Sequence, residues 1–66
     1  SCFPEVILSE ELVTRIRHGQ RVSMDNLPQS QGWVSLIKPN RELIGAGEID
    51  STGEIVPKRL IAAENS

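Results

Sequence analysis

The chain has very few of the residues that build metal sites, disulfide frameworks or membrane spans. Among its 66 residues there is one cysteine and one histidine. A single cysteine excludes a disulfide within the chain, and Cys2 with His18 makes too few ligands for zinc, so we expect neither a metal nor another cofactor. No apolar run approaches the roughly 18 residues that span a bilayer. Residues 1–5 lack a signal-peptide pattern. We therefore expect a protein of the reducing cytoplasm with no membrane contact.

Aromatic side chains and excess positive charge are also scarce, which argues against the simplest nucleic-acid binders. The aromatic residues are Phe3 and Trp33, with no tyrosine, whereas single-strand binders stack bases on several exposed rings. Seven basic and nine acidic residues give a net charge of −2 at pH 7, while free-standing nucleic-acid binders are usually basic. RNA contact would therefore need a local basic patch or another domain. We expect Trp33 to be a buried core indole rather than a stacking platform.

The length allows one small domain and leaves little room for catalysis. With 66 residues, of which 38% are hydrophobic, the chain lies near the lower limit of what folds without a staple. We expect residues 5–62 to form the domain, residues 1–4 to be a disordered start and residues 63–66 to be frayed. The sequence contains no acid–base pair, metal cluster or activated nucleophile. We therefore expect no enzymatic activity from this chain alone.

The best-signalled element is a helix over residues 10–18. Ser9 is a good N-cap residue, and the acidic residues after it suit the positive end of the helix dipole. Gly19 ends the helix because glycine tolerates the left-handed conformation. Glu11 and Arg15 have the spacing of an ion pair across one turn. The predicted buried stripe consists of Leu12, Val13 and Ile16.

After Gly19 the pattern becomes that of strands separated by turns. A loop is predicted at 25–32 and turns at 39–42 and 50–53, and Pro57 indicates that the last strand lies at an edge or bulges there. The predicted strands cover residues 20–24, 33–38, 43–49 and 54–62, with a further short strand at 6–8. The order is β-α-β-β-β-β. Closely spaced strands predict a mainly β fold with one helix, in which an antiparallel sheet curls into a small barrel and the helix closes one end.

Two features could support binding. Gly45 and Gly47 lie on one face of a predicted strand, which indicates close packing against another backbone, the helix or a ligand.

Around Gly19, arginines cluster at the helix end. They are either solvated and favoured by the dipole, or they form a phosphate-binding corner together with a free N–H of Gly19. Lys58 and Arg59 are adjacent on a strand, so they point to opposite faces and only one of them can join such a patch.

The terminal segments resemble a known family. The sequence LIGAGEID at 43–50, followed by GEIVPKRL at 53–60, resembles the C-terminal end of bacterial tRNA pseudouridine synthase B. In that family G-x-G-E-[ILV]-D, a turn with glycine and x-P-[KR]-R-[LV] close the protein. The predicted helix and the G-[QN]-x-V pattern at 19–22 are also similar to the family. The resemblance covers roughly residues 5–62.

The resemblance implies a PUA-like pseudo-barrel that is a fragment of a longer enzyme. The family's N-terminal catalytic domain, absent here, supplies the aspartate that isomerises a flipped-out uridine in the T-loop of tRNA. The implied partners are tRNA and this catalytic domain, but neither DNA nor a membrane. No residue of this chain is implied to be catalytic. The implied RNA-binding residues are Arg17, His18, Gly19, Gln20 and Arg21, with Lys58 and Arg59 as secondary contacts.

An alternative is a domain whose main role is packing, against its own catalytic domain or another protein. A contiguous uncovered face containing Phe3, Trp33, Gly45 and Gly47 would favour packing. An open surface formed by Arg17, Arg21 and Lys58 would favour RNA.

Overall fold

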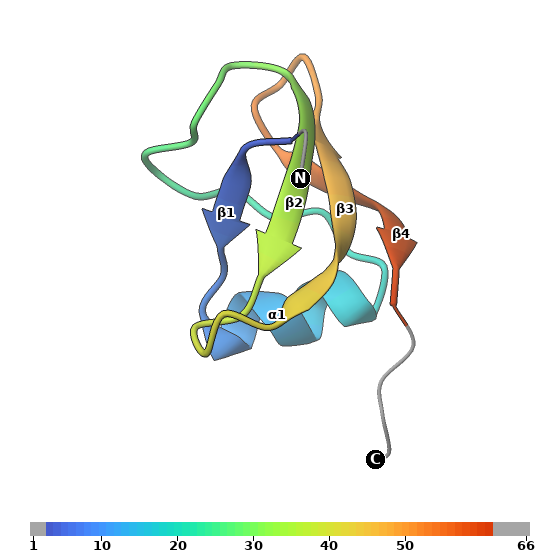
Figure 1. The fold of residues 1–66 in the computed structure, drawn as a ribbon. Helices are drawn as coiled ribbons and strands as arrows, with labels where there is room; N and C mark the ends of the chain where they lie inside the picture. Colours follow the sequence, from blue (N-terminus) through green and yellow to red (C-terminus); the bar gives the residue numbers. More distant parts are fainter. Residues whose placement is uncertain (1–2, 62–66) are drawn as a thin grey trace.

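The computed structural model describes residues 3–61, so Cys2 and residues 62–66 lie outside the described part. Four strands and one helix follow in the order β1 (Glu5–Ile7), α1 (Glu10–Arg17), β2 (Gly32–Ile37), β3 (Leu43–Ile49) and β4 (Ile55–Leu60). They form one sheet in which β1 is parallel to β2, whereas β2, β3 and β4 are antiparallel. Figure 1 shows α1 across one end of this sheet. The expected fold class, mainly β with one helix, is confirmed.

The helix forms where its capping residues predict it. The Ser9 hydroxyl accepts a hydrogen bond from the Leu12 N–H at 3.3 Å, which satisfies one of the unpaired donors of the first turn. At the other end Gly19 has a φ of +82°. The N–H groups of Gly19 and Gln20 donate to the carbonyls of Ile16 and Arg15 at 2.9 and 3.0 Å. This pattern is a Schellman motif, in which a left-handed glycine satisfies the last carbonyls of a helix.

The core lies between the sheet and the helix. Val13 and Ile16 of α1 are buried there, and Leu12 packs against it while remaining partly exposed. The loop after the helix contributes Met24 and Leu27 to the same side. The other buried members of the core are Val6, Leu8, Val22, Val34, Leu36, Ile44, Ile49 and Ile55.

The sheet is open, and the strand expected over residues 20–24 is wrong. Only Val22 pairs, through an isolated antiparallel bridge to Ile55 with N–H···O distances of 3.0 and 2.8 Å. Continued in this register, the ladder would place Gln20 opposite Pro57, which has no N–H to donate. In the other direction Gly53 would have to pair, but its N–H already donates to the Asp50 carbonyl at 3.0 Å. Pairing therefore stops after one bridge, and β1 and β4 remain the two edges.

The two strand glycines allow β4 to cross close to β3. A Cβ at Gly45 would overlap the carbonyl oxygen of Arg59, and a Cβ at Gly47 would lie 2.9 Å from the carbonyl oxygen of Val56. Gly45 also has a φ of +150°. The prediction of close packing against another backbone is thereby confirmed. Pro57 lies in an edge strand beside a register shift opposite Gly47, as expected.

Trp33 is not the core indole that we expected. Its side chain is 39% exposed and stacks on Phe3, with ring centroids 5.9 Å apart and an angle of 22° between the rings. The reason is strand alternation: Val34 and Leu36 point into the core, so Trp33 points to the opposite face of β2. Within residues 3–61, no helix is long and apolar enough to cross a membrane.

Candidate functional site

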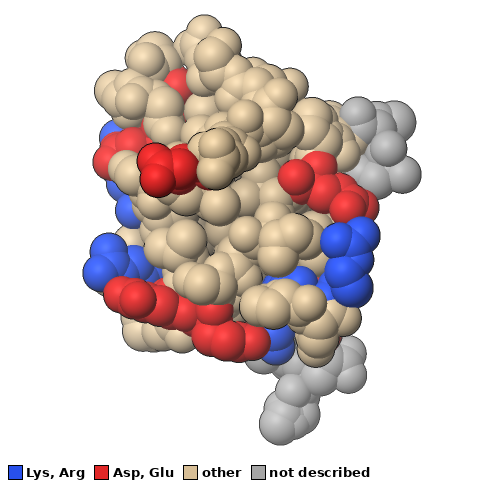
Figure 2. Space-filling model, turned by 90° about the vertical axis from the view of Figure 1, so that its left-hand side faces the viewer, with Lys and Arg blue, Asp and Glu red and all other residues tan. Residues whose placement is uncertain are grey.

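Most cations of the chain are neutralised by carboxylates. Within residues 3–61, five of the seven Lys and Arg side chains form ion pairs. On the face drawn in Figure 2, basic and acidic side chains accordingly lie next to one another around an area of other residues. The paired cations are Arg15 with Glu11, Arg21 with Asp50 and Glu54, Lys38 with Glu42, Arg41 with Glu5, and Lys58 with Glu48. Of the cations in the described part, Arg17 and Arg59 have no carboxylate partner.

Arg17 and Arg59 lie near the same end of β4. The Arg17 guanidinium donates to the carbonyl oxygen of Ile61 at 3.3 Å, which joins the last turn of α1 to the chain just after β4. Arg59 lies two residues before that carbonyl and is exposed. The Arg59 side chain makes no hydrogen bond or ion pair with any of residues 3–61. We call Arg17, the His18–Gln20 turn and Arg59 the helix-end corner.

The turn within this corner is open, but its N–H groups are not free. His18, Gly19 and Gln20 are exposed, and a Cβ placed on Gly19 would have no atom within 4 Å. The expectation of a free Gly19 N–H is wrong, because the Schellman motif uses that donor, and the one of Gln20, to cap the helix. Another backbone can approach Gly19 closely, but hydrogen bonds to it would have to come from the side chains around it.

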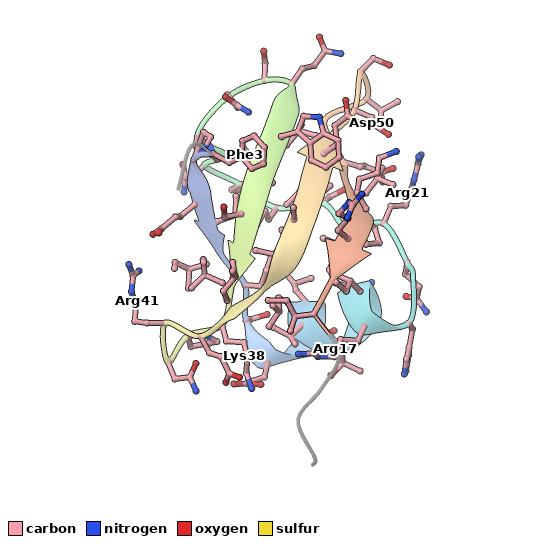
Figure 3. All side chains as sticks on the ribbon, turned by 45° about the vertical axis from the view of Figure 1, so that its right-hand side comes forward. Phe3, Arg17, Arg21, Lys38, Arg41 and Asp50 are labelled. Atoms are coloured by element: carbon pink, nitrogen blue, oxygen red, sulfur yellow. The ribbon has the colours of Figure 1, made fainter. Side chains whose placement is uncertain are left out.

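Arg21 is separated from the helix-end corner. Its guanidinium contacts Asp50 at 3.2 Å and Glu54 at 3.4 Å, and Glu54 also accepts from the Ser23 hydroxyl at 3.3 Å. These partners lie just before and at the start of β4, whereas Arg17 contacts the chain after its end. The six residues between span about 20 Å. Figure 3 shows Arg17 and Arg21 near opposite ends of β4. The single basic cluster expected around Gly19 is therefore divided in two.

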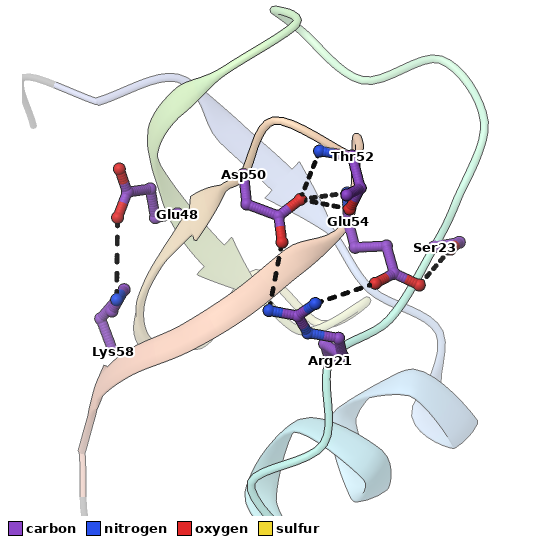
Figure 4. Close-up of polar contacts among 7 residues, drawn as sticks. All are labelled: Arg21, Ser23, Glu48, Asp50, Thr52, Glu54 and Lys58. Atoms are coloured by element: carbon purple, nitrogen blue, oxygen red, sulfur yellow. Dashed lines mark hydrogen bonds and ion pairs between the residues drawn. The ribbon is translucent and has the colours of Figure 1, made fainter.

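Asp50 organises the turn that holds Arg21. One oxygen of its carboxylate accepts from the Thr52 hydroxyl at 2.6 Å and from the N–H groups of Thr52 and Glu54 at 3.0 and 3.1 Å (Figure 4). The Thr52 hydroxyl above all, with these N–H groups and Arg21, holds the pKa of Asp50 below its usual 3.8, against an opposing effect of desolvation. The turn predicted over residues 50–53 is confirmed. We call Arg21, Ser23, Asp50, Thr52 and Glu54 the turn network.

Lys58 and Arg59 also differ in their surroundings. The Lys58 ammonium lies 3.8 Å from the Glu48 carboxylate on the neighbouring strand (Figure 4). Lys58 is the extra residue of β4 at the register shift between Ala46 and Gly47. Arg59 keeps its place opposite Ala46 and has no carboxylate partner in the described part of the chain. Among residues 3–61, no three His, Asp or Glu side chains are grouped as metal ligands would be.

The described residues define a small mixed-sheet domain with one helix across its end and two exposed arginines near the end of β4. Residues 4–61 match the family described as pseudouridine synthase II TruB, C-terminal. The chain belongs to this family, and the resemblance seen in the sequence is confirmed.

The chain is also similar to a set of curated relatives, each called tRNA pseudouridine synthase B. It is 44% identical over 60 residues to the protein of Vibrio cholerae strain O395, covering 89% of this chain and 19% of the relative. Identity is 38% over 61 residues to that of Aeromonas salmonicida, covering 92% and 19%. With the protein of Nitrosococcus oceani, identity is 38% over 63 residues, covering 96% and 20%. The chain thus spans about one fifth of the length of these relatives.

Proposed function

We propose that this domain is the tRNA-holding, C-terminal part of a tRNA pseudouridine synthase. In this proposal it positions tRNA while an N-terminal catalytic domain, absent from this chain, isomerises a uridine in the T-loop. The family match and the names of the relatives support the kind of enzyme. The positions of the arginines in this chain support the way in which the RNA is held.

The single observation that carries the binding proposal is that Arg17 and Arg59 have no carboxylate partner within residues 3–61. An arginine already paired to a carboxylate must give up that partner before it can bind a phosphate, whereas an unpaired exposed arginine loses only water and rotamer freedom. The helix-end corner offers Arg17 beside an exposed turn with no side chain at Gly19, and Arg59 near the same end of β4. Its chemistry fits phosphate contacts, which position a nucleic acid without reading its sequence.

The remaining predicted contacts take a secondary place in this proposal. His18 and Gln20 flank Gly19 and can donate hydrogen bonds to phosphate or ribose. Arg21 and Lys58 are predicted to contribute less than Arg17 and Arg59, because carboxylates occupy them in the absence of RNA.

Catalysis in the proposed enzyme is assigned to the absent domain. Asp50 is a poor candidate for a nucleophile, because Thr52, Glu54 and Arg21 already engage both of its carboxylate oxygens. The proposed role of this domain is therefore binding and positioning alone.

Steady-state kinetics of the full-length enzyme test this role. Arg17→Ala and Arg59→Ala should each raise KM for tRNA, by roughly five- to tenfold at 0.1 M salt, because each removes one phosphate contact. The value of kcat should stay unchanged, since neither arginine is proposed to contact the reacting base. Tritium release from uridine-labelled tRNA measures both constants.

The matched control is Arg41→Ala, which removes an exposed arginine that is paired with Glu5 at 3.1 Å. It should leave KM within twofold. An unchanged KM in both Arg17→Ala and Arg59→Ala would refute the helix-end corner as the tRNA contact. A fall in kcat without a rise in KM would instead give these arginines a role in the chemical step.

A further inference from the structure

The two faces of the sheet differ in what covers them. One face packs against α1 and against Met24 and Leu27 of the loop that follows it. Within the described residues no helix covers the other face, which we call the open face and which is turned toward the viewer in Figure 1. It exposes four large apolar side chains, which are Phe3 (41% exposed), Ile7 (41%), Trp33 (39%) and Leu43 (48%).

Strand register joins these side chains along β2. Ile37 lies opposite Ile7 on one side and opposite Leu43 on the other, so the three side chains form one row across the sheet. Ile37 is only 5% exposed, which shows how closely this row packs. Trp33 lies on the same face four residues earlier and carries the stacked ring of Phe3. Exposed apolar side chains gathered on one face in this way mark an interaction surface.

The charges around the open face favour a protein partner over RNA. Glu5 pairs with Arg41 at 3.1 Å, and Glu48 pairs with Lys58 at 3.8 Å. Arg41 and Lys58 are thus matched by carboxylates, so a phosphate backbone gains little at these two cations. An apolar protein surface can cover the isoleucine, leucine and aromatic side chains without breaking these pairs.

The position of the first described residues indicates which partner covers the open face. In the relatives, about four fifths of the polypeptide lies outside the matched part, and the family model describes the C-terminal end and begins at residue 4 of this chain. Here the carbonyl of Pro4 accepts from the Ser35 N–H of β2 at 2.8 Å, and Phe3, which is labelled in Figure 3, stacks on Trp33. Phe3, the first residue that the structure describes, therefore lies on the open face.

We propose that the open face, formed by Phe3, Ile7, Trp33 and Leu43, packs against the N-terminal part of the longer protein. This inference rests on the proposed function only in treating the chain as the C-terminal part of a synthase. Packing there fixes the orientation of the sheet, and with it the position of the helix-end corner relative to the catalytic domain.

Hydroxyl-radical footprinting of the full-length protein, without tRNA, tests this inference. Mass spectrometry would compare modification of Ile7 and Leu43 with that of Leu60, each normalised to its rate in the unfolded chain. Leu60 is an aliphatic control of similar exposure, 37%, on the other side of the sheet beside Gly45. We expect Ile7 and Leu43 to be modified at least fivefold more slowly than Leu60. Equal rates, or protection of Leu60 instead, would overturn the proposal.

A substitution gives a second, independent readout. Leu43→Glu in the full-length protein should bring the modification of Ile7 up to the rate of Leu60, because a buried charge would open the interface. Leu36, which is fully buried in this domain, should stay unmodified and so report that the domain is still folded. Continued protection of Ile7 in a folded Leu43→Glu protein would contradict the proposal.

The same experiment separates this inference from the proposed function. Protection of Ile7 and Leu43 only after tRNA is added would make the open face an RNA surface and overturn the proposal. Protection without tRNA, together with unchanged KM values in the arginine variants, would uphold the interface and refute the helix-end corner.

Discussion

The two ends of β4 hold arginines in opposite states. In the turn network, Arg21 contacts two carboxylates, and one of these also accepts from Ser23. At the helix-end corner, Arg17 donates to a backbone carbonyl and Arg59 has no partner among the described residues. Net charge does not reveal this difference, since a chain of charge −2 can still present two arginines that have no carboxylate partner within residues 3–61. Ion pairing with carboxylates, rather than the number of cations, determines which arginines are available to bind phosphate.

The largest expected effect on stability comes from disrupting the close approach of β4 to Gly45 of β3, which holds β4 in place. Gly45→Val should lower the free energy of unfolding by about 3 kcal/mol, because the side chain would meet the Arg59 carbonyl and force a strained backbone. Both ends of β4 would then be lost together. Urea denaturation measures the change. Ala46→Val, on the opposite face of the same strand, is the control and should change stability by less than about 1 kcal/mol. Equal midpoints for Gly45→Val and the parent would mean that β4 does not pack here.

Acid should weaken the turn network before it affects the helix-end corner. Because the pKa of Asp50 is lowered on folding, its ionised form stabilises the fold above its ordinary value of 3.8. That stabilisation is lost as the pH falls below 3.8 and through the folded-state pKa. Asp50→Asn should remove this part of the pH dependence. Denaturant midpoints between pH 6 and pH 2 measure it, and parallel curves for the two proteins would show that Asp50 makes no such contribution.

Arg21 should matter more for stability than for tRNA. Arg21→Ala should cost about 0.5–1 kcal/mol, because it removes an exposed double ion pair and leaves Asp50 and Glu54 facing each other. Arg15→Ala, which removes an ordinary exposed pair within α1, is the control and should cost about 0.3–0.5 kcal/mol. Thermal unfolding at low and high salt compares them. A larger loss in Arg15→Ala would show that the turn network adds nothing beyond single surface pairs.

The elements that depend on local sequence were predictable. The helix follows from Ser9 and Gly19, and the strand Leu43–Ile49 has the bounds that alternation and the flanking turns predict. The errors concern pairing across the chain. The strand over residues 20–24 fails because its register would require an N–H from Pro57, and the sheet stays open as a result. Side chains alternate between the two faces of a strand, so a buried Val34 already indicates that Trp33 lies on the outer face. The general preference of indoles for the core predicts the opposite, and here it is wrong.

The candidate site was predictable as a set of residues but not as an arrangement. Arg17 and Arg21 are four positions apart in the sequence and were expected to act together. Arg21 instead pairs with Glu54, which lies 33 positions later in the sequence. This contact holds Arg21 at the other end of β4, and no local sequence pattern indicates it. Arg17 lies near the end of β4 that carries Arg59 only because the chain after β4 reaches α1.

The salt dependence of tRNA binding by the full-length protein tests the difference between the two ends most directly. Filter binding at several salt concentrations would compare Arg17→Ala and Arg21→Ala with the parent. We predict that Arg17→Ala lowers the slope of log K against log salt by somewhat less than one unit, because one phosphate contact is lost. Arg21→Ala should leave the slope unchanged. A loss of slope in Arg21→Ala with none in Arg17→Ala would place the RNA at the turn network and contradict the account.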